Sequence, residues 1–229
     1  MKEQEFENVL IVRTDRIGDV ILTLPMIPAL LANFPGLRIS MLICSYTREL
    51  VDGFAGLNST LTYDDGSRLK GFFALVAELR KRRFDLVFVV HPTFRLALSM
   101  LLAGMRARVG TGYRWYSFLF NRRVLEHRRT AEKHEAEYNL SLLQAIGCDV
   151  QAIPSVTLEV SATARKAADL ELKRLGIQTG GKLVILHPGS GGSAREWSAQ
   201  NFGDLAKVLK EDGCSVVITG SQSENPLVD

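Results

Sequence analysis

The first residues that could do chemistry follow the apolar run Val9–Val12 and span Arg13–Asp19, with the sequence Arg-Thr-Asp-Arg-Ile-Gly-Asp. Ligands of open α/β sheets bind at the carboxyl ends of the strands, so a loop directly after a predicted strand is well placed to contact one. Gly18 permits close backbone approach, and Asp19 falls in the first turn of the helix expected to follow. The alternative is that Asp19 only complements the dipole of that helix.

A second loop, His187–Trp197, lies between a predicted strand and a predicted helix. Backbone N–H groups in such a loop, for example at Gly191, can hold phosphate oxygens. Ser190 and Ser193 add hydroxyl donors, and the planar guanidinium of Arg195 can grip two phosphate oxygens. No Gly-Lys-Ser/Thr sequence and no complete GxGxxG fingerprint is present, so a nucleoside diphosphate fits better than a triphosphate. The alternative is an ordinary glycine-rich loop with a solvated arginine.

A third candidate, Glu224, follows the last predicted strand in the segment Gly220–Glu224. A carboxylate at this place in a nucleotide-binding fold can accept hydrogen bonds from ribose hydroxyls. The alternative is that Glu224 is a loop or cap residue. The histidines show no metal-ligand spacing, so we expect no metal site; they are His91, His127, His134 and His187.

Arginine is concentrated in one window, from Arg95 to Arg129. The window holds eight arginines, no lysine and one acidic residue, Glu126, and so carries +7 in a chain whose net charge is +3. A positive surface attracts an anionic partner: phosphate, a lipid headgroup or nucleic acid. Aromatic residues lie among the arginines, which suits a membrane interface or stacked bases. The alternative is a basic loop whose aromatic residues pack on the core; these residues are Tyr113, Trp115, Tyr116, Phe118 and Phe120.

Short apolar runs alternate with longer helical patterns, which predicts an α/β fold whose parallel strands are buried on both faces. Pro25 and Pro28 are expected to kink or delay the first helix. The alternation of strands and helices is interrupted by a connector and then resumes. We therefore expect one domain over residues 1–160 and a second over residues 161–229. The second holds only two predicted strands, fewer than the five or six of a doubly wound sheet. The predicted strands are Val9–Val12, Ile39–Ile43, Leu61–Tyr63, Leu86–Val90, Arg108–Gly110, Leu183–Leu186 and Ser215–Thr219, and the predicted helices are 18–33, 47–54, 69–82, 93–103, 132–146, 161–175 and 198–211.

Composition excludes several classes of protein. The 229-residue chain has 46% hydrophobic and 23% charged residues. This composition excludes a disordered protein, a collagen-like protein and a coiled coil. Its most apolar stretch, Val20–Phe34, is interrupted by polar residues and prolines and falls short of the ~20 residues that cross a bilayer. The acidic start shows no export signal, and three distant cysteines encode neither a disulfide framework nor a zinc site. We therefore expect a reducing, cytoplasmic setting.

The sequence resembles glycosyltransferase family 9, the ADP-heptose:lipopolysaccharide heptosyltransferases, over essentially its whole length. The resemblance is carried by Leu10–Pro25 (LIVRTDRIGDVILTLP) and by the loop from His187-Pro188-Gly189 to Arg195-Glu196-Trp197. The segments Arg106–Gly110 and His134–Gly147 also fit the family pattern. Two departures are Ser198, where the family commonly has proline, and the later Asp-Thr-x-x-x-His phosphate motif, which lies beyond the last residue given.

The resemblance implies an α/β fold of GT-B type, with two Rossmann-like, doubly wound domains of which the second is incomplete here. Residues 1–160 would bind the acceptor, and residues 161–229 would begin the domain that binds the ADP-sugar. The implied reaction is inverting transfer of a heptose or related sugar to the lipopolysaccharide inner core, with Asp19 as general base. The implied donor contacts are Ser190, Gly191, Ser193 and Arg195 for the phosphates and Glu224 for the ribose. With arginine at the diphosphate, no metal or other cofactor is expected.

The implied acceptor, Kdo-lipid A or a core oligosaccharide, carries carboxylates and phosphates. We expect basic side chains to hold it where a monomeric, cytoplasmic protein meets the inner face of the cytoplasmic membrane. Two alternatives stay open: a non-catalytic acceptor-binding fragment, and a family member with another sugar donor. A nucleic-acid-binding protein is disfavoured, because no recognition module is present and the rest of the chain is acidic. The candidate acceptor or membrane contacts are Arg13, Arg16, Arg106, Arg114, Arg122 and Arg123.

Overall fold

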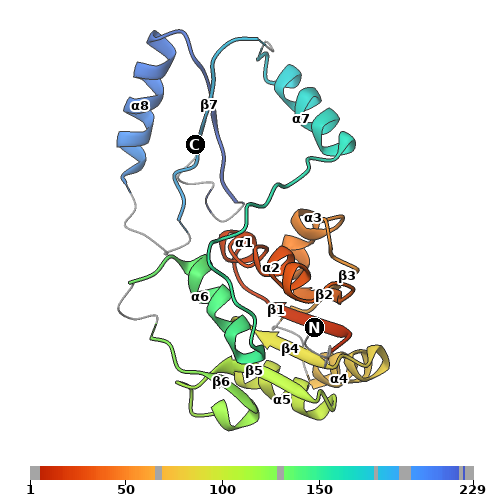
Figure 1. Ribbon diagram of the computed structural model, residues 1–229. Coiled ribbons are helices and arrows are strands. Elements are labelled where there is room, and N and C mark those ends of the chain that lie inside the picture. Colours follow the sequence, from red (N-terminus) through yellow and green to blue (C-terminus); the bar gives the residue numbers. More distant parts are fainter. Residues whose placement is uncertain are drawn as a thin grey trace. The chain divides into compact units, whose positions relative to one another are not determined.

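The computed structural model describes residues 6–64, 69–127, 132–177, 180–190, 197–221 and 224 (Figure 1). The chain divides into two compact units, residues 1–159 and residues 160–229. Gly191, Ser193 and Arg195, three of the predicted phosphate contacts, lie outside the described residues.

A six-stranded sheet forms the centre of the first unit, and all its strand pairs are parallel. The strand order is β3-β2-β1-β4-β5-β6, so the chain extends the sheet first to one side of β1 and then to the other (Figure 1). In such sheets the crevice at the carboxyl ends of the two central strands, here β1 and β4, is the preferred ligand site. The strands are β1 (Asn8–Arg13), β2 (Arg38–Ile43), β3 (Ser59–Thr62), β4 (Leu86–Val89), β5 (Ala107–Thr111) and β6 (Arg122–Val124).

Helices cover both faces of this sheet, because successive side chains of each strand point to opposite sides. Val9 and Ile11 pack in one core cluster, whereas Leu10 and Val12 pack in the other. The first cluster includes residues of α1 (Ile17–Ile21), α2 (Met26–Asn33), α3 (Arg48–Val51), α6 (Glu135–Ser141) and the 3₁₀ helix η4 (Leu142–Ile146). The second includes residues of α4 (Leu69–Arg82), α5 (Phe94–Leu102) and the 3₁₀ helix η2 (Ser117–Leu119). The predicted α/β class, with strands buried on both faces, is confirmed.

Two elements differ from the sequence-based expectation in a way that matters for the site. The first helix is divided, because Pro25 cannot continue a helical ladder: α1 ends at Ile21, and Pro25 is the N-cap of α2. Strand β6 was not predicted, since its sequence Arg-Arg-Val has no apolar run; it pairs with β5 at the edge of the sheet, with Val109 opposite Arg122.

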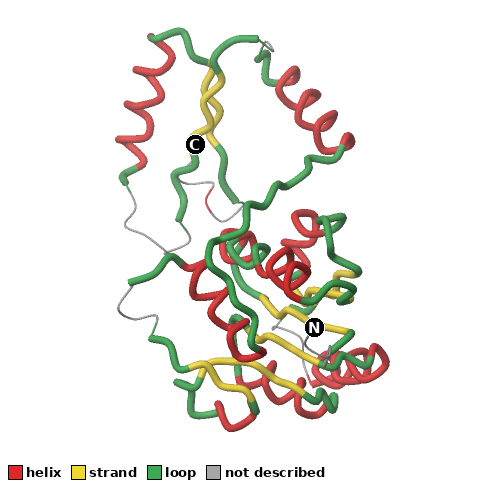
Figure 2. The backbone as a smooth tube through the Cα atoms, viewed as in Figure 1, coloured by secondary structure: helices red, strands yellow, loops and turns green. Residues whose placement is uncertain are grey.

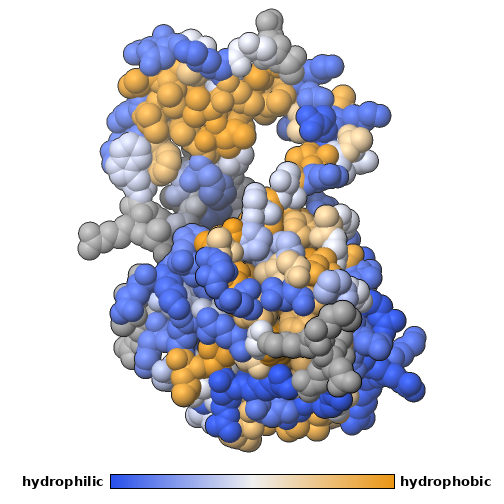
Figure 3. Space-filling model, viewed as in Figure 1, coloured by the Kyte–Doolittle hydropathy of each residue, from blue (hydrophilic) through white to orange (hydrophobic). Residues whose placement is uncertain are grey.

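The second unit contains α7 (Ala162–Arg174), β7 (Leu183–Leu186), α8 (Ala199–Glu211) and β8 (Ser215–Ile218). β7 and β8 pair in parallel (Figure 2). Ser198, the departure from the family's proline, is the N-cap of α8 and accepts a hydrogen bond from Asn201 N at 3.2 Å. Apolar residues gather on the visible face over β7 and α8 (Figure 3). In β7, Ile185 is 62% exposed. In neither unit do the described residues include a helix long and apolar enough to span a membrane.

Gly110 on β5 offers a test of the packing beneath the site. A Cβ built at Gly110 would lie 2.7 Å from two ring carbons of Phe120, and Phe120 is 1% exposed. We expect Gly110→Ala to lower the free energy of unfolding by about 1–3 kcal/mol, because an overpacked core must shift. Urea denaturation followed by circular dichroism measures the change.

Gly18→Ala is the matched control, since a Cβ there meets no atom of the described chain within 4 Å. Its unfolding midpoint should stay the same or rise, because alanine is favoured over glycine in a helix by roughly 0.5–1 kcal/mol. An unchanged midpoint for Gly110→Ala would contradict the packing described.

Candidate functional site

A cavity of about 620 Å³ opens at the carboxyl edge of the six-stranded sheet. It lies at the ends of β1, β4, β5 and β6, with α6 forming one wall, and therefore occupies the crevice that the strand order predicts. Its lining is mixed and combines apolar residues such as Val89 and Leu142 with polar groups. The polar and aromatic lining residues are Arg13, His91, Thr111, Tyr113, Arg114, Glu126, His127 and Tyr138.

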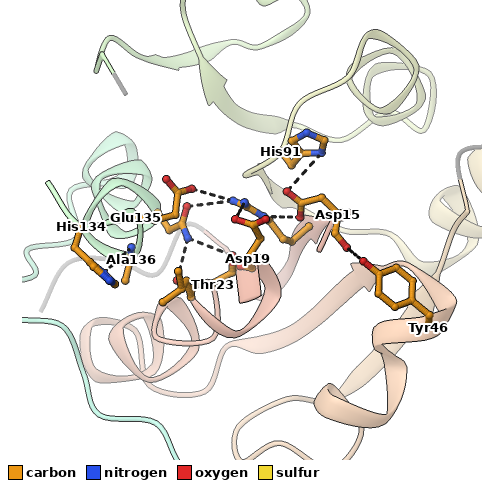
Figure 4. A network of polar contacts seen from close by, with 11 residues as sticks. Asp15, Asp19, Thr23, Tyr46, His91, His134, Glu135 and Ala136 are labelled. Carbon is orange, nitrogen blue, oxygen red and sulfur yellow. Dashed lines mark hydrogen bonds and ion pairs between the residues drawn. The ribbon is translucent and has the colours of Figure 1, made fainter. Parts of the chain in front are cut away.

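Arg13, the last residue of β1, is the centre of a polar network and lines this cavity. Figure 4 shows three members of the network, Asp15, Asp19 and Glu135. The Arg13 side chain is only 4% exposed, and its guanidinium contacts three carboxylates. Nε lies 2.7 Å from Asp15 Oδ1 and Nη2 lies 2.7 Å from Asp19 Oδ1. Nη1 lies 3.3 Å from Glu135 Oε1 on α6. A buried guanidinium requires such partners, and its planar fork holds each carboxylate in a defined direction.

Asn139 on α6 completes the network from the opposite side. This residue is fully buried, and its Oδ1 accepts a hydrogen bond from Arg13 Nη1 at 3.4 Å. Its Nδ2 donates to the carbonyl of Leu22 at 2.9 Å and to Thr23 Oγ1 at 3.3 Å. Thr23 Oγ1 in turn donates to the carbonyl of Asp19 at 2.8 Å. Through Asn139, helix α6 therefore contacts both the Arg13 guanidinium, which binds the Asp19 carboxylate, and the backbone that follows Asp19.

Asp15 and Asp19 share the guanidinium but differ in their other neighbours. Asp15 Oδ2 lies 3.9 Å from His91 Nδ1, and the backbone carbonyl of Asp15 accepts a hydrogen bond from the Tyr46 hydroxyl at 2.6 Å. Partial burial raises the pKa of Tyr46, so its hydroxyl stays a donor at neutral pH. The Asp15 side chain is 17% exposed and that of Asp19 is 30% exposed. Asp19, held through Oδ1, is therefore the carboxylate more open to a ligand.

The arginines predicted to bind an acceptor or a membrane do not lie together. Arg13 and Arg114 line the cavity, and Arg16 is the exposed N-cap of α1. Arg106 and Arg122 lie at the amino ends of β5 and β6, where their guanidiniums lie 5.5 Å and 5.1 Å from the centre of the Phe6 ring. The exposed Arg123 follows Arg122 in β6. The arginines of the Arg95–Arg129 window that the structure describes are thus spread over both edges of the sheet and form no single patch.

Other described residues of the Arg95–Arg129 window are either packed within the first unit or exposed on its surface. Arg108 Nε donates to the carbonyl of Leu119 at 2.8 Å, and burial lowers the pKa of Arg108, so this arginine fastens a loop. Tyr116 and Phe120 pack in the core, as the alternative interpretation held, whereas Trp115 is 74% exposed.

In the second unit, Glu224 lies beside the predicted phosphate loop. Its Oε2 accepts a hydrogen bond from Ser221 N at 2.7 Å, and this bond lowers the pKa of Glu224. The carboxylate lies so close to Gly189 that a Cβ there would be 1.8 Å from Oε1. His187 Nδ1 and Thr219 Oγ1, 3.0 Å apart, join the ends of β7 and β8. Glu224 therefore caps its own loop and also faces the loop that contains Ser190.

Several residues of the network were not singled out from the sequence. Glu135, Asn139 and His91 are distant from Arg13 in the chain, and no spacing rule connects them with it. The signal that could have indicated two of them is the segment His134–Gly147, which fits the family pattern. Within the described residues, no group of three or more histidine, cysteine, aspartate or glutamate side chains could hold a metal ion.

Removing the Arg13 guanidinium from the network should lower the stability of the fold measurably. We expect Arg13→Met to lower the free energy of unfolding by about 2–4 kcal/mol, because the carboxylates around it then lose their partner. Asp15→Asn, made in the Arg13→Met background, should restore part of that loss. A double-mutant cycle by urea denaturation measures the coupling, and simple additivity of the two changes would show that the contact contributes little.

Comparison with known proteins assigns this architecture to a family. Residues 72–228 match glycosyltransferase family 9 (heptosyltransferase). A Haemophilus influenzae protein described only as a glycosyltransferase is 29% identical over 226 residues, covering 96% of this chain and 65% of that protein. Lipopolysaccharide heptosyltransferase 3 of Escherichia coli is 23% identical over 216 residues, covering 92% of this chain and 63% of the relative. The chain thus spans a little under two thirds of these relatives.

Solved structures agree with the fold. A family 9 glycosyl transferase from Veillonella parvula superposes with a TM-score of 0.86 at 19% identity, over 99% of this chain and 66% of that one. The Escherichia coli ADP-heptose LPS heptosyltransferase II gives a TM-score of 0.77 at 22% identity, over 96% of this chain and 66% of that one.

Proposed function

The chain belongs to glycosyltransferase family 9, and we propose that it acts as an inverting transferase, moving a heptose or related sugar from an ADP-sugar to the lipopolysaccharide inner core. The observation that carries the proposal is the position of Asp19: a carboxylate, 30% exposed, that is held at 2.7 Å by the buried guanidinium of Arg13, and Arg13 lines the cavity at the switch point of the sheet. The names of the relatives, lipopolysaccharide heptosyltransferases and an ADP-heptose heptosyltransferase, support the donor and the acceptor.

In this proposal Asp19 is the general base. An acceptor hydroxyl in the cavity gives its proton to the Asp19 carboxylate while its oxygen attacks the anomeric carbon of the donor. The bond from that carbon to the diphosphate breaks, and ADP leaves from the opposite face, which inverts the configuration. A positioned base of this kind contributes about 10²–10⁴-fold to the rate.

We assign Arg13 a positioning role rather than a surface contact with acceptor or membrane. Its guanidinium is 4% exposed and already faces Asp15, Asp19 and Glu135. The bond from Nη2 to Asp19 Oδ1 fixes the direction of the carboxylate, and Asn139 fixes the backbone below it. A base held in this way has little freedom to turn away from the reacting hydroxyl.

On the donor side, the proposal uses the loop after β7. Ser190, Gly191, Ser193 and Arg195 would contact the diphosphate and stabilise the charge that builds on it as the sugar leaves, so no divalent metal is needed. Glu224, beside Gly189, would accept hydrogen bonds from the ribose hydroxyls. The lowered pKa of Glu224 suits an acceptor of hydrogen bonds, because it keeps the carboxylate ionised.

On the acceptor side, the cavity offers cationic and aromatic groups to an anionic sugar. Arg114 can pair with a carboxylate or phosphate, while the ring of Tyr113, 3.9 Å from that of His127, provides a flat wall. Kdo-lipid A or a core oligosaccharide fits this chemistry. Because such an acceptor is anchored in lipid, we place the monomeric protein in the cytoplasm, peripherally at the inner face of the cytoplasmic membrane.

A second candidate function is acceptor binding without catalysis. It is favoured by the cavity, whose lining comes entirely from the first unit and offers cationic and aromatic groups to an anionic sugar. The two candidates are separated by incubating the 229-residue chain with ADP-heptose and Kdo-lipid A. Release of ADP supports the transferase, whereas acceptor binding without release supports the second candidate.

Asp19→Asn tests the base directly, because it keeps the shape of the side chain and removes its ability to take a proton. We expect kcat to fall at least about 10²-fold, while the affinity for ADP is unchanged. Asp149→Asn, an exposed carboxylate elsewhere in the same unit, is the control and should leave kcat unchanged. Unchanged turnover in Asp19→Asn would make Asp19 a purely structural residue.

Glu224→Gln tests the proposed ribose contact. The affinities of the variant and of the unmodified chain are compared for ADP, 2′-deoxy-ADP and 3′-deoxy-ADP. If the carboxylate accepts a ribose hydroxyl, the substitution should weaken ADP binding about tenfold and reduce the preference for ADP over one deoxy analogue. Isothermal titration calorimetry measures both, with the exposed Glu211→Gln as control. If Glu224→Gln keeps the full preference for ADP over both analogues, Glu224 makes no ribose contact and its role is limited to the hydrogen bond with Ser221.

A further inference from the structure

Large apolar side chains are exposed on α4, on α5 and in the loop after β5, and we name four of them the aromatic rim: the aromatic residues Phe73, Phe94 and Trp115, together with Leu69. Their exposures are 62%, 38%, 74% and 76%. Phe94 and Trp115 stack with ring centres 5.0 Å apart, and Phe73 contacts Phe72 edge-on at 5.4 Å. Exposed aromatic residues that cluster in this way mark interaction sites more often than single exposed residues do.

The aromatic rim lies on the same edge of the sheet as the candidate site. Leu69 and Phe73 lie in the first two turns of α4, Phe94 is the first residue of α5, and Trp115 lies between β5 and η2. The chain enters α4, α5 and η2 after leaving β3, β4 and β5, respectively, so these positions belong to the carboxyl side of the sheet (Figure 1). Phe94 is separated by two residues from His91, which lines the cavity. The Tyr116 hydroxyl donates to the carbonyl of Pro92 at 2.6 Å, which ties the Trp115 loop to the cavity wall.

The charge beside the rim is positive. Lys70 lies in the first turn of α4, Arg95 lies in the first turn of α5, and neither first turn contains an acidic residue. The Arg95 guanidinium lies 5.9 Å from the centre of the Phe72 ring, and Arg114 directly precedes Trp115. Basic and aromatic side chains are therefore interleaved along this edge, in contrast to Arg106 and Arg122 at the opposite edge.

We propose that the aromatic rim is the surface by which this protein docks on an anionic lipid bilayer. Tryptophan and phenylalanine rings enter the headgroup region of a membrane, and lysine and arginine beside them pair with anionic headgroups. The proposal rests on the proposed function, since a lipid-anchored acceptor then presents its sugar to the neighbouring cavity while its acyl chains remain in the bilayer. A basic residue directly flanks Leu69, Phe94 and Trp115, namely Lys70, Arg95 and Arg114; anionic headgroups account for this pairing, whereas an apolar protein partner would not require it.

The chain supplies its own reporter, because it contains two tryptophans, Trp115 and Trp197. In Trp197→Phe the remaining fluorophore is Trp115 on the rim; in Trp115→Phe it is Trp197, which is 52% exposed in the second unit. Each variant is mixed with vesicles of phosphatidylethanolamine and phosphatidylglycerol, with and without brominated acyl chains. We expect the brominated chains to reduce Trp115 emission about twofold or more and to leave Trp197 emission unchanged, because only a ring within the bilayer contacts them.

Co-sedimentation with the same vesicles gives a second measurement. Trp115→Ser combined with Phe73→Ser should lose most of the bound fraction, whereas Leu170→Ser, an equally exposed apolar residue on α7, should keep it. Three results would overturn the proposal: no vesicle binding by the unmodified chain, vesicle binding with Trp115 unquenched, or equal binding of the double variant and the unmodified chain. A second protein or a second copy of this chain would then be the occupant to seek.

Neither measurement uses the donor or requires turnover, so the outcome is independent of the transferase assignment. Transfer to an acceptor stripped of its acyl chains is measured separately. Quenching of Trp115 without any transfer would uphold the docking surface and reject the transferase. Transfer to the stripped acceptor without quenching would do the reverse.

Discussion

The buried guanidinium of Arg13 is the interaction on which the carboxyl edge of the six-stranded sheet depends. It ends the central strand β1 among three carboxylates, and one of them, Glu135, comes from α6. A charge in this position is stable only while its partners stay in place, so the loop after β1 and helix α6 are held to each other. Asn139 extends the constraint to the backbone around Leu22 and Thr23. The proposed base, Asp19, inherits its orientation from this set of contacts.

The parallel sheet explains why such an arrangement forms at this place. The strand order reverses beside β1, so the loops after β1 and β4 diverge to opposite sides and leave a crevice between them. Arg13, the last residue of β1, and His91, from the loop after β4, both contact Asp15 of the loop after β1. The same geometry brings the beginnings of α4 and α5 to this edge, and with them the exposed aromatic residues. The proposed acceptor site and the proposed docking surface therefore share one edge of the unit.

The distribution of arginine shows how a fold redistributes charge. Each strand runs from the amino edge of the sheet to the carboxyl edge. Residues only a few positions apart in the sequence can therefore lie at opposite edges. Arg106 and Arg122 therefore lie at the amino edge around Phe6, Arg108 is used internally, and Arg114 alone of the four reaches the cavity. The positive charge beside the aromatic rim comes from Lys70, outside the Arg95–Arg129 window, and from Arg95 and Arg114 within it, and these residues belong to different elements.

Local patterns in the sequence determined the α/β class, most strands and helices, the break at Pro25 and the end of η4 at Gly147, because each depends on neighbours in the chain. They also determined family membership, through the Arg13–Asp19 segment and the loop after β7. The tertiary structure alone decided that Arg13 is buried, that Glu135 and Asn139 are its partners, and that the Arg-Arg-Val segment forms β6. It also decided which of the clustered arginines and aromatic residues share a surface. These features depend on strand order and on contacts between distant segments, and neither leaves a local periodicity in the sequence.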